Sequence, residues 1–240
     1  MGENGLLFSE NNILEKLDQL SSDLPVYLKK IKVQSIEDIY EKYMNFFLKI
    51  NQQNKPKYLN NKIINKIINP TLSGLRDLNT NFKGFLYAGL MIVNNEPFLI
   101  EYNVRMGDPE CQTILPKLKT DFIKLITACV NKNLSTINLE WYDDKSLCIV
   151  LCSKGYPEIY KNNIEIKNLK DIKLNHDEFI FHAGTKKEKD KILSNGGRVL
   201  NFVIRSDSFK NNRQKAINLI NQINWGNGFF RKDIGYKVID

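Results

Sequence analysis

Residues 84–104 read GFLYAGLMIVNNEPFLIEYNV, and this stretch decides the fold of the region around it. An apolar run from Gly84 to Val93 precedes the turn-forming sequence Asn94-Asn95-Glu96. Polar and apolar residues then alternate from Pro97 to Val104. Two strand-like runs on either side of a short polar turn predict a β-hairpin whose second strand presents polar side chains on one face.

The end of the second strand carries residues that suit phosphate chemistry. If residues 101–105 are extended, then Glu101, Asn103 and Arg105 lie on one face, because successive side chains of a strand alternate between its two faces. A carboxylate and an amide oxygen suit a nucleotide-bound magnesium ion, and a guanidinium can neutralise a transferred phosphoryl group. The pattern alone favours a solvent-facing strand with a cross-strand ion pair.

The sequence on either side of the hairpin predicts helices before it and a mixture of helices and strands after it. Apolar residues at helical spacing predict helices at 13–20 and 36–50, and a third at 59–75 that Pro70 kinks or breaks. Residues 51–57 are polar and form the best candidate boundary. After the hairpin we expect helices at about 111–132 and 211–224, and strands at 146–153, 178–182 and 198–204.

The composition excludes several classes of protein. With 240 residues, of which 42% are hydrophobic and 26% charged, the chain is typical of a soluble globular protein. No apolar run approaches the twenty or so residues of a membrane span, and no signal for secretion is recognised, so we expect a cytosolic protein. The four cysteines form no C-x-x-C pair, which makes a zinc site improbable, and Cys148 and Cys152 are expected to pack on one face of a strand.

The formal net charge of +8 permits attraction to anions but does not select a partner. The densest lysine cluster, residues 186–191, is interrupted by Glu188 and Asp190, and we interpret it as a solvated turn or helix of mixed charge. Basic and aromatic residues do not alternate as in RNA-binding segments. Binding to nucleic acid is therefore disfavoured.

A series of motifs in one order along the chain resembles a known family. The motifs are residues 82–92 (FKGFLYAGLMI), 101–112 (EYNVRMGDPECQ), Leu115-Pro116, Gly155-Tyr156-Pro157, His182-Ala183-Gly184-Thr185, 195–200 (NGGRVL) and 231–235 (RKDIG). Together they resemble the C-terminal portion of the phosphoribosylamine–glycine ligases, also called glycinamide ribonucleotide synthetases, over roughly residues 59–240. These enzymes are ATP-grasp ligases of de novo purine biosynthesis.

The resemblance implies an α+β fold in three parts. Residues 1–56 would be a helical segment of unknown role, and residues 57–138 would be a partial ATP-grasp domain comprising its large half. Residues 139–240 would be the small, β-rich C-terminal domain of the family.

The resemblance also implies an activity and a set of site residues. The family joins glycine to 5-phosphoribosylamine through a glycyl phosphate while ATP is hydrolysed to ADP and phosphate. Glu101 and Asn103 would hold Mg²⁺ or Mn²⁺ against the ATP phosphates, and Arg105 would face the transferred phosphate as a catalytic and nucleotide-binding residue. Asp108 and Glu110 would border the substrate pocket, although a purely structural turn is an equal alternative for them.

Other motifs give less specific expectations. His182 is more typical of a structural hydrogen-bonding group than of a substrate ligand, and Gly196-Gly197 is expected to form a turn with positive φ. Arg198 would either reach an anion or form a surface ion pair. The family's N-terminal domain and small ATP-grasp half are not recognised, so we expect a separately encoded N-terminal half as a partner. The alternative is an inactive remnant that serves in docking or oligomerisation.

Overall fold

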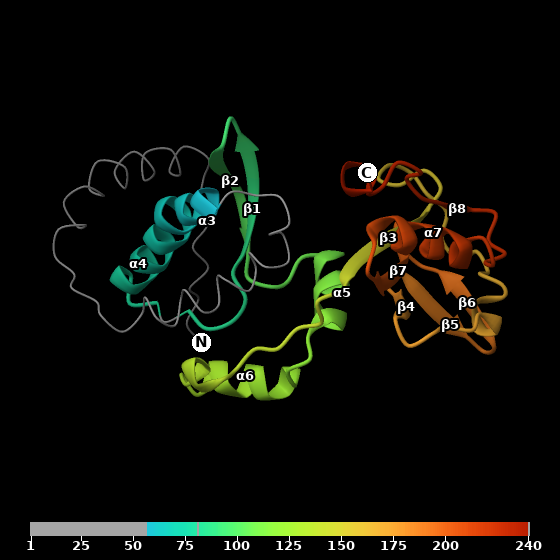
Figure 1. Ribbon diagram of the computed structural model, residues 1–240. Helices are drawn as coiled ribbons and strands as arrows, with labels where there is room; N and C mark the ends of the chain where they lie inside the picture. The colour runs from blue at the N-terminus through green and yellow to red at the C-terminus, as the bar shows by residue number, and fades with distance from the viewer. Residues whose placement is uncertain (1–56, 81, 240) are drawn as a thin grey trace, which may run out of the picture. The chain divides into compact units, whose positions relative to one another are not determined.

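The computed structural model describes residues 57–80 and 82–239 (Figure 1). Backbone contacts divide the chain between residues 53 and 54, so the described residues all belong to the second of two units. The helices predicted at 13–20 and 36–50, and with them the helical segment 1–56, lie outside the described residues. Within the described ranges, no helix is both long enough and apolar enough to cross a membrane.

The described chain begins with a helix that continues through Pro70. It consists of α3 (Lys57–Ile63), a π-helical turn η1 (Ile64–Ile68) and α4 (Asn69–Asp77). Of the two alternatives predicted at Pro70, a kink or a break, the break is therefore wrong. Proline has no N–H to donate within a helix, and here the wider π-helical turn ends at Ile68, two residues before the proline. The carbonyl of Ile67 accepts hydrogen bonds from the hydroxyl of Thr71 at 2.8 Å and from that of Tyr102 at 3.3 Å.

The predicted β-hairpin is present as strands β1 (Tyr87–Val93) and β2 (Glu96–Asn103), which pair in antiparallel fashion. Asn94 and Asn95 both have positive φ, of 50° and 61°, as a two-residue type I′ turn requires. Glu96 therefore belongs to β2 rather than to the turn. It forms ion pairs with Lys62 and Lys66 of the first helical region, the latter at 2.9 Å, and these contacts attach the hairpin to that helix.

The single helix expected at 111–132 is instead several short elements. They are α5 (Glu110–Ile114), η2 (Leu115–Lys117), α6 (Phe122–Val130) and η3 (Leu134–Thr136). Pro116 lies in the 3₁₀ turn, and Asp121 starts a new helix by accepting a hydrogen bond from the N–H of Lys124 at 3.0 Å. Between them, Leu118 forms a β-bridge with Trp141. Apolar spacing alone did not reveal these two interruptions.

The C-terminal region is built on one antiparallel sheet with the strand order β4-β7-β3-β8. Its strands are β3 (Lys145–Ser153), β4 (Glu178–His182), β7 (Arg198–Ser206) and β8 (Gly228–Phe229). Helix α7 (Phe209–Ile220) packs on one face, over a core that includes Ile149, Phe202 and Ala216 (Figure 1). On the opposite face the sheet contacts α5. The remaining elements are η4 (Leu169–Asp171) and η5 (Tyr236–Val238).

Two local predictions in this region need correction. The final helix begins before residue 211, because Ser208 caps it by accepting a hydrogen bond from the N–H of Asn211 at 3.3 Å, and it ends at Ile220. The lysine cluster is a β-hairpin of β5 (Thr185–Glu188) and β6 (Lys191–Ser194) rather than a solvated turn or helix. Its side chains are nevertheless of mixed charge, and Lys186 pairs with Glu188 at 2.6 Å.

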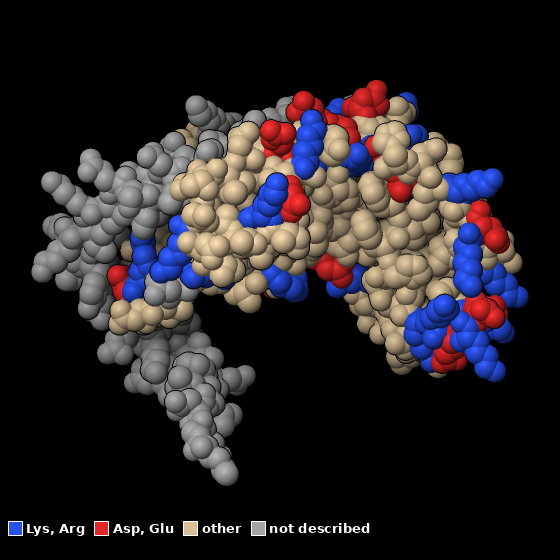
Figure 2. Space-filling model, turned by 90° about the horizontal axis from the view of Figure 1, so that it is seen from below, with Lys and Arg blue, Asp and Glu red and all other residues tan. Residues whose placement is uncertain are grey.

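Positive and negative side chains also lie close together elsewhere on the described surface. Figure 2 shows Lys and Arg interspersed with Asp and Glu over the described part of that face. Such a surface is typical of a solvated protein exterior.

Candidate functional site

The exposed end of β2 carries Glu101 and Asn103 on one face of the hairpin. Asn103 donates a hydrogen bond through Nδ2 to Oε1 of Glu101 at 2.9 Å, so the two side chains are direct neighbours. This is the arrangement that strand alternation predicted for them. Neither side chain points into an apolar core, since Glu101 is exposed and Asn103 half-buried.

A β-bulge and a glycine make room for Glu101. Gly89 pairs with Glu101 and Leu90 pairs with Leu99, so Ile100 is an extra residue in β2. A Cβ atom at Gly89 would lie 3.1 Å from Cγ of Glu101, which is tighter than ordinary van der Waals contact. The missing side chain at Gly89 therefore lets the Glu101 stem cross the neighbouring strand.

Arg105 does not extend this strand face as expected. Strand β2 ends at Asn103, and Arg105 lies in the bend that follows. Its side chain is exposed and donates a hydrogen bond through Nη1 to the carbonyl oxygen of Met106 at 2.9 Å. The assumption that residues 101–105 form one continuous strand was therefore wrong for its last two positions.

The turn after the strand places two further carboxylates in this region. Asp108 accepts a hydrogen bond at Oδ1 from Nε2 of Gln112 at 2.8 Å. The Glu110 carboxylate lies against the backbone of Gly107, where a Cβ atom would come within 2.3 Å of Oε2 and 3.3 Å of the Tyr87 ring. Glycine at position 107 thus allows the Glu110 carboxylate and the edge of the Tyr87 ring to meet.

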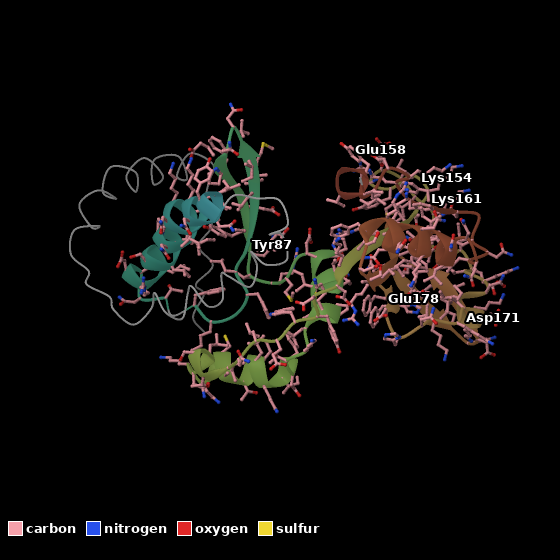
Figure 3. The ribbon with its side chains drawn as sticks, in the orientation of Figure 1. Tyr87, Lys154, Glu158, Lys161, Asp171 and Glu178 are labelled. Atoms are coloured by element: carbon pink, nitrogen blue, oxygen red, sulfur yellow. The ribbon has the colours of Figure 1, made fainter. Side chains whose placement is uncertain are left out.

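Tyr87 lies between the Asp108–Glu110 turn and the pair Glu101 and Asn103. The sequence analysis did not identify this tyrosine as a site residue. It is the first residue of β1, it pairs with Asn103, and it is labelled in Figure 3. Partial burial, together with the neighbouring carboxylates of Glu110 and Glu101, raises the pKa of the Tyr87 hydroxyl. Strand alternation places Tyr87 on the same face as Gly89, which pairs with Glu101. Once the hairpin register is known, alternation therefore predicts that Tyr87 lies on the face of the candidate site.

Arg198 joins the C-terminal sheet to the same turn. Its Nη2 forms an ion pair with Oδ2 of Asp108 at 3.2 Å, and its Nη1 donates a hydrogen bond to the Asp108 carbonyl oxygen at 2.8 Å. Of the two expectations for Arg198, the ion pair is the one the structure contains. The pair is partly exposed, with side-chain exposures of 41% for Arg198 and 37% for Asp108, so further polar groups can reach it.

The thiols of Cys111, Cys148 and Cys152, which lie near this turn, have raised pKa values, whereas a nucleophilic thiol needs a lowered one. Burial, together with the charge of Asp108, raises the pKa of Cys111, and stronger burial raises that of Cys148 to about 12. Burial also raises the pKa of Cys152, opposed by the charge of Arg198. Because thiolates are the reactive form, the raised pKa values disfavour a nucleophilic role for these three residues.

Three other motif residues, His182, Gly196 and Gly197, make contacts typical of structural residues. His182 is exposed, and its Nδ1 lies 2.9 Å from Oγ1 of Thr185. Gly196 and Gly197 do not have the positive φ predicted for them. They are instead sites of close approach, because a Cβ atom at Gly196 would lie 3.1 Å from Cα of Gly184, and one at Gly197 would overlap the ring of Tyr156.

Within the described residues, no group of three or more His, Cys, Asp or Glu side chains could hold a metal ion by itself. A cation at Glu101 and Asn103 would therefore need ligands from elsewhere. The other residues labelled in Figure 3 are Lys154, Glu158, Lys161, Asp171 and Glu178, which belong to the C-terminal region.

Comparison with known proteins gives the same family for the region that contains the β1–β2 hairpin and for the C-terminal region. The model of the phosphoribosylglycinamide synthetase ATP-grasp (A) domain matches residues 50–111, and the model of the C domain of the same synthetase matches residues 146–237. The phosphoribosylamine–glycine ligase of Fusobacterium nucleatum is 42% identical over 180 residues, which are 75% of this chain and 42% of the relative. The chloroplastic enzyme of Arabidopsis thaliana is 37% identical over 187 residues, 76% of this chain and 35% of the relative.

A solved structure is also similar. The crystal structure of phosphoribosylamine–glycine ligase from Thermotoga maritima matches with a TM-score of 0.64 and 28% sequence identity, covering 75% of this chain and 44% of that chain. This chain spans less than half the length of the curated relatives that it matches.

Proposed function

Since the chain belongs to the phosphoribosylglycinamide synthetase family over the residues that the two domain models match, we propose that it is the part of a phosphoribosylamine–glycine ligase that carries the metal-binding strand, the substrate turn and the C domain. In this assignment residues 57–138 are the partial ATP-grasp domain and residues 139–240 the C-terminal domain. The observation that carries the proposal is the contact of Glu101 with Asn103 at the exposed end of β2, within the matched A domain.

The reaction proceeds in two steps. A carboxylate oxygen of glycine attacks the γ-phosphorus of ATP, and ADP leaves, which gives glycyl phosphate. The amine of 5-phosphoribosylamine then attacks the glycyl carbonyl carbon, phosphate leaves, and an amide bond remains. The names of the relatives support this ligase reaction rather than an inactive docking remnant.

The pair formed by Glu101 and Asn103 has the spacing of two ligands of one Mg²⁺ or Mn²⁺ ion. Adjacent oxygens around an octahedral magnesium ion lie about 2.9 Å apart when each is 2.0–2.1 Å from it. The Asn103 amide nitrogen lies 2.9 Å from Glu101 Oε1, and a 180° rotation of that amide would bring Oδ1 to the same position. When bound, the ion would neutralise charge on the ATP phosphates. Two protein oxygens are too few for six-coordination, so we expect weak binding without nucleotide.

We assign Arg105 to the transferred phosphate. Its guanidinium is exposed and donates one hydrogen bond among the described residues, to the adjacent carbonyl of Met106, so most of its five donors face solvent. A fork of this kind binds phosphate in a bidentate manner. Because Arg105 lies two residues after the end of β2, its side chain is close enough along the chain to rotate toward phosphates held at Glu101.

The Asp108–Glu110 turn is our candidate for recognition of the substrate. Its two carboxylates suit the ammonium group of glycine or the amine of 5-phosphoribosylamine. The turn follows Asn103 by only a few residues, and Tyr87 touches it from β1. A substrate bound there would lie beside nucleotide phosphates held at the end of β2.

Binding of Mg²⁺-ATP to the purified chain tests the metal assignment. Glu101→Ala should abolish metal-dependent nucleotide binding without changing the circular dichroism spectrum, because the exposed carboxylate contributes little to packing. Binding is followed by Mn²⁺-induced broadening of the amide resonances of residues 101–103 in the presence of ATP. Glu158→Ala, at an exposed carboxylate of the C-terminal region, is the matched control and should bind as the wild type does. Equal binding by Glu101→Ala and wild type would refute the assignment.

A complementation assay tests the reaction. The chain alone should release no ADP that depends on glycine and 5-phosphoribosylamine, because ATP phosphates must be contacted from both sides for transfer. Adding the portion of the Fusobacterium nucleatum ligase that this chain does not cover should restore turnover, and Glu101→Ala should prevent the restoration. Substrate-dependent ADP release by the chain alone would contradict the expected need for a partner.

A further inference from the structure

The Asp108 turn is attached to the C-terminal sheet by two bonds from one side chain. Arg198 binds both the Asp108 carboxylate, at 3.2 Å, and the Asp108 main-chain carbonyl, at 2.8 Å. A guanidinium that binds a side chain and the backbone of the same residue fixes the orientation of that residue as well as its position. Residues 108 and 198 are 90 positions apart, so the contact joins the two matched regions of the chain.

A β-bulge determines the direction of Arg198. Along β7, Leu200, Phe202 and Ile204 belong to the core beneath α7, and a regular alternation would place Arg198 on that same face. Leu151 pairs with Leu200, however, while Cys152 pairs with Arg198, so Val199 is an extra residue in β7. The bulge reverses the alternation and turns Arg198 away from the core, as bulges near functional sites commonly do.

Glycines hold the backbone of Arg198 in place. The N–H of Gly184 donates to the Arg198 carbonyl at 2.9 Å, and a Cβ atom at Gly184 would lie only 2.7 Å from that oxygen. On the next strand, Ser153 is fully buried and donates through N to Gly197 O and through Oγ to Gly196 O, each at 2.8 Å. The motifs at residues 182–185 and 195–200 thus meet around Arg198.

We propose that Arg198 is a positioning residue of the A domain's substrate turn. Arg198 comes from the C domain, its direction is set by the Val199 bulge, and it holds the Asp108–Glu110 turn in the geometry that binds the ammonium group of glycine. This role rests on the proposed function. Arg198 acts through Asp108, whose remaining carboxylate contact is the Gln112 amide at 2.8 Å. On the other side of the turn, Gly107 and the Tyr87 ring confine Glu110. In this role the C domain contributes to substrate affinity through Arg198.

Amide hydrogen exchange of the full chain tests the attachment itself. Arg198→Ala should accelerate exchange in the peptide containing residues 106–113 by about tenfold, including the Cys111 N–H that bonds to Gly107 O. Exchange in the β3–β7 ladder should stay unchanged. Arg198→Lys keeps the charge but not the two-bond geometry, so its effect should be intermediate. Methylguanidinium should slow exchange in Arg198→Ala toward the wild-type rate.

The matched control is Arg231→Ala, which also removes a partly exposed Arg–Asp pair of the C-terminal region, with Asp233 at 2.7 Å. It should leave exchange at residues 106–113 unchanged. If Arg198→Ala also leaves that exchange unchanged, the proposal is overturned, whatever the enzyme does.

Ligand titrations separate positioning from mere packing. In the presence of Mg²⁺-ATP, Arg198→Ala should weaken glycine binding about tenfold and leave Mg²⁺-ATP binding unchanged, since Glu101 and Asn103 do not contact it. Faster exchange with unaltered glycine affinity would show a purely structural contact and refute the positioning role. If the wild type binds Mg²⁺-ATP but no glycine, the proposed substrate turn fails and the positioning role fails with it. If the wild type binds neither ligand, the proposed function fails, while the exchange data still decide whether Arg198 fixes the turn.

Discussion

At the scale of single residues, Cys148 shows most clearly how burial changes chemistry. It lies on β3, on the face that contacts α5, and burial raises the pKa of its thiol to about 12. Charges on Asp108 and Glu110 act in the same direction. Only a minute fraction of this thiol is ionised at neutral pH, which agrees with its expected packing role.

This pKa predicts a defined pH dependence of stability. The folded-state pKa lies above the unfolded value, so the stabilisation from the neutral thiol is fully present below pH 9 and is lost as the pH rises toward 12. At pH 10.5 the wild type should have lost about 2 kcal/mol relative to pH 8 through this group. The measurement is the free energy of unfolding in urea at both pH values, for wild type and Cys148→Ala. An equal loss in the two proteins would contradict the prediction.

At the scale of elements, the first helical region shows how sequence signals interact. Pro70 does not interrupt it. The π-helical turn η1 ends two residues before the proline, and in the same region the Ile67 carbonyl accepts hydrogen bonds from the hydroxyls of Thr71 and Tyr102. One of these donors, Tyr102, belongs to β2. A tertiary contact thus supports a helix that its local sequence disfavours.

Gly74 gives a test of local propensity in the same helix. It is exposed within α4, and a Cβ atom there would meet nothing within 4 Å. Gly74→Ala should therefore raise the free energy of unfolding by roughly 0.5–1 kcal/mol, because alanine loses less backbone entropy in a helix. Urea unfolding followed by circular dichroism measures this change. Gly226→Ala is the control, because Gly226 also has open space around it but lies outside the helices and strands. A loss of stability in Gly74→Ala would contradict the prediction and show that the helix surface has an undescribed contact.

At the scale of the whole molecule, the chain divides between residues 53 and 54. The described residues of the C-terminal core belong to the second unit and include Trp225, which is 7% exposed. We therefore expect residues 54–240 to keep the near-ultraviolet circular dichroism of the C domain when residues 1–53 are removed. The buried tryptophan gives this signal its sensitivity. Loss of the signal on deletion would show that the N-terminal residues contribute to that core.

The sequence by itself determined the features that depend on short-range periodicity. Strand alternation has a period of two, so it fixed the hairpin and the common face of Glu101 and Asn103. The Asn94-Asn95 pair determined the turn, because asparagine tolerates positive φ. The ordered motifs determined the family, and the two domain models match the same regions.

The tertiary structure alone decided how distant segments meet. The bond between Arg198 and Asp108 joins residues 90 positions apart, and it depends on a bulge at Val199 that alternation could not reveal. Gly196 is required for close packing against Gly184, a contact between two loops rather than a local φ. Local sequence sets backbone preferences worth at most about 1 kcal/mol per residue, apart from proline, which costs about 3 kcal/mol inside a helix. Packing between segments outweighs these preferences, and its partners are specified only when the chain is folded.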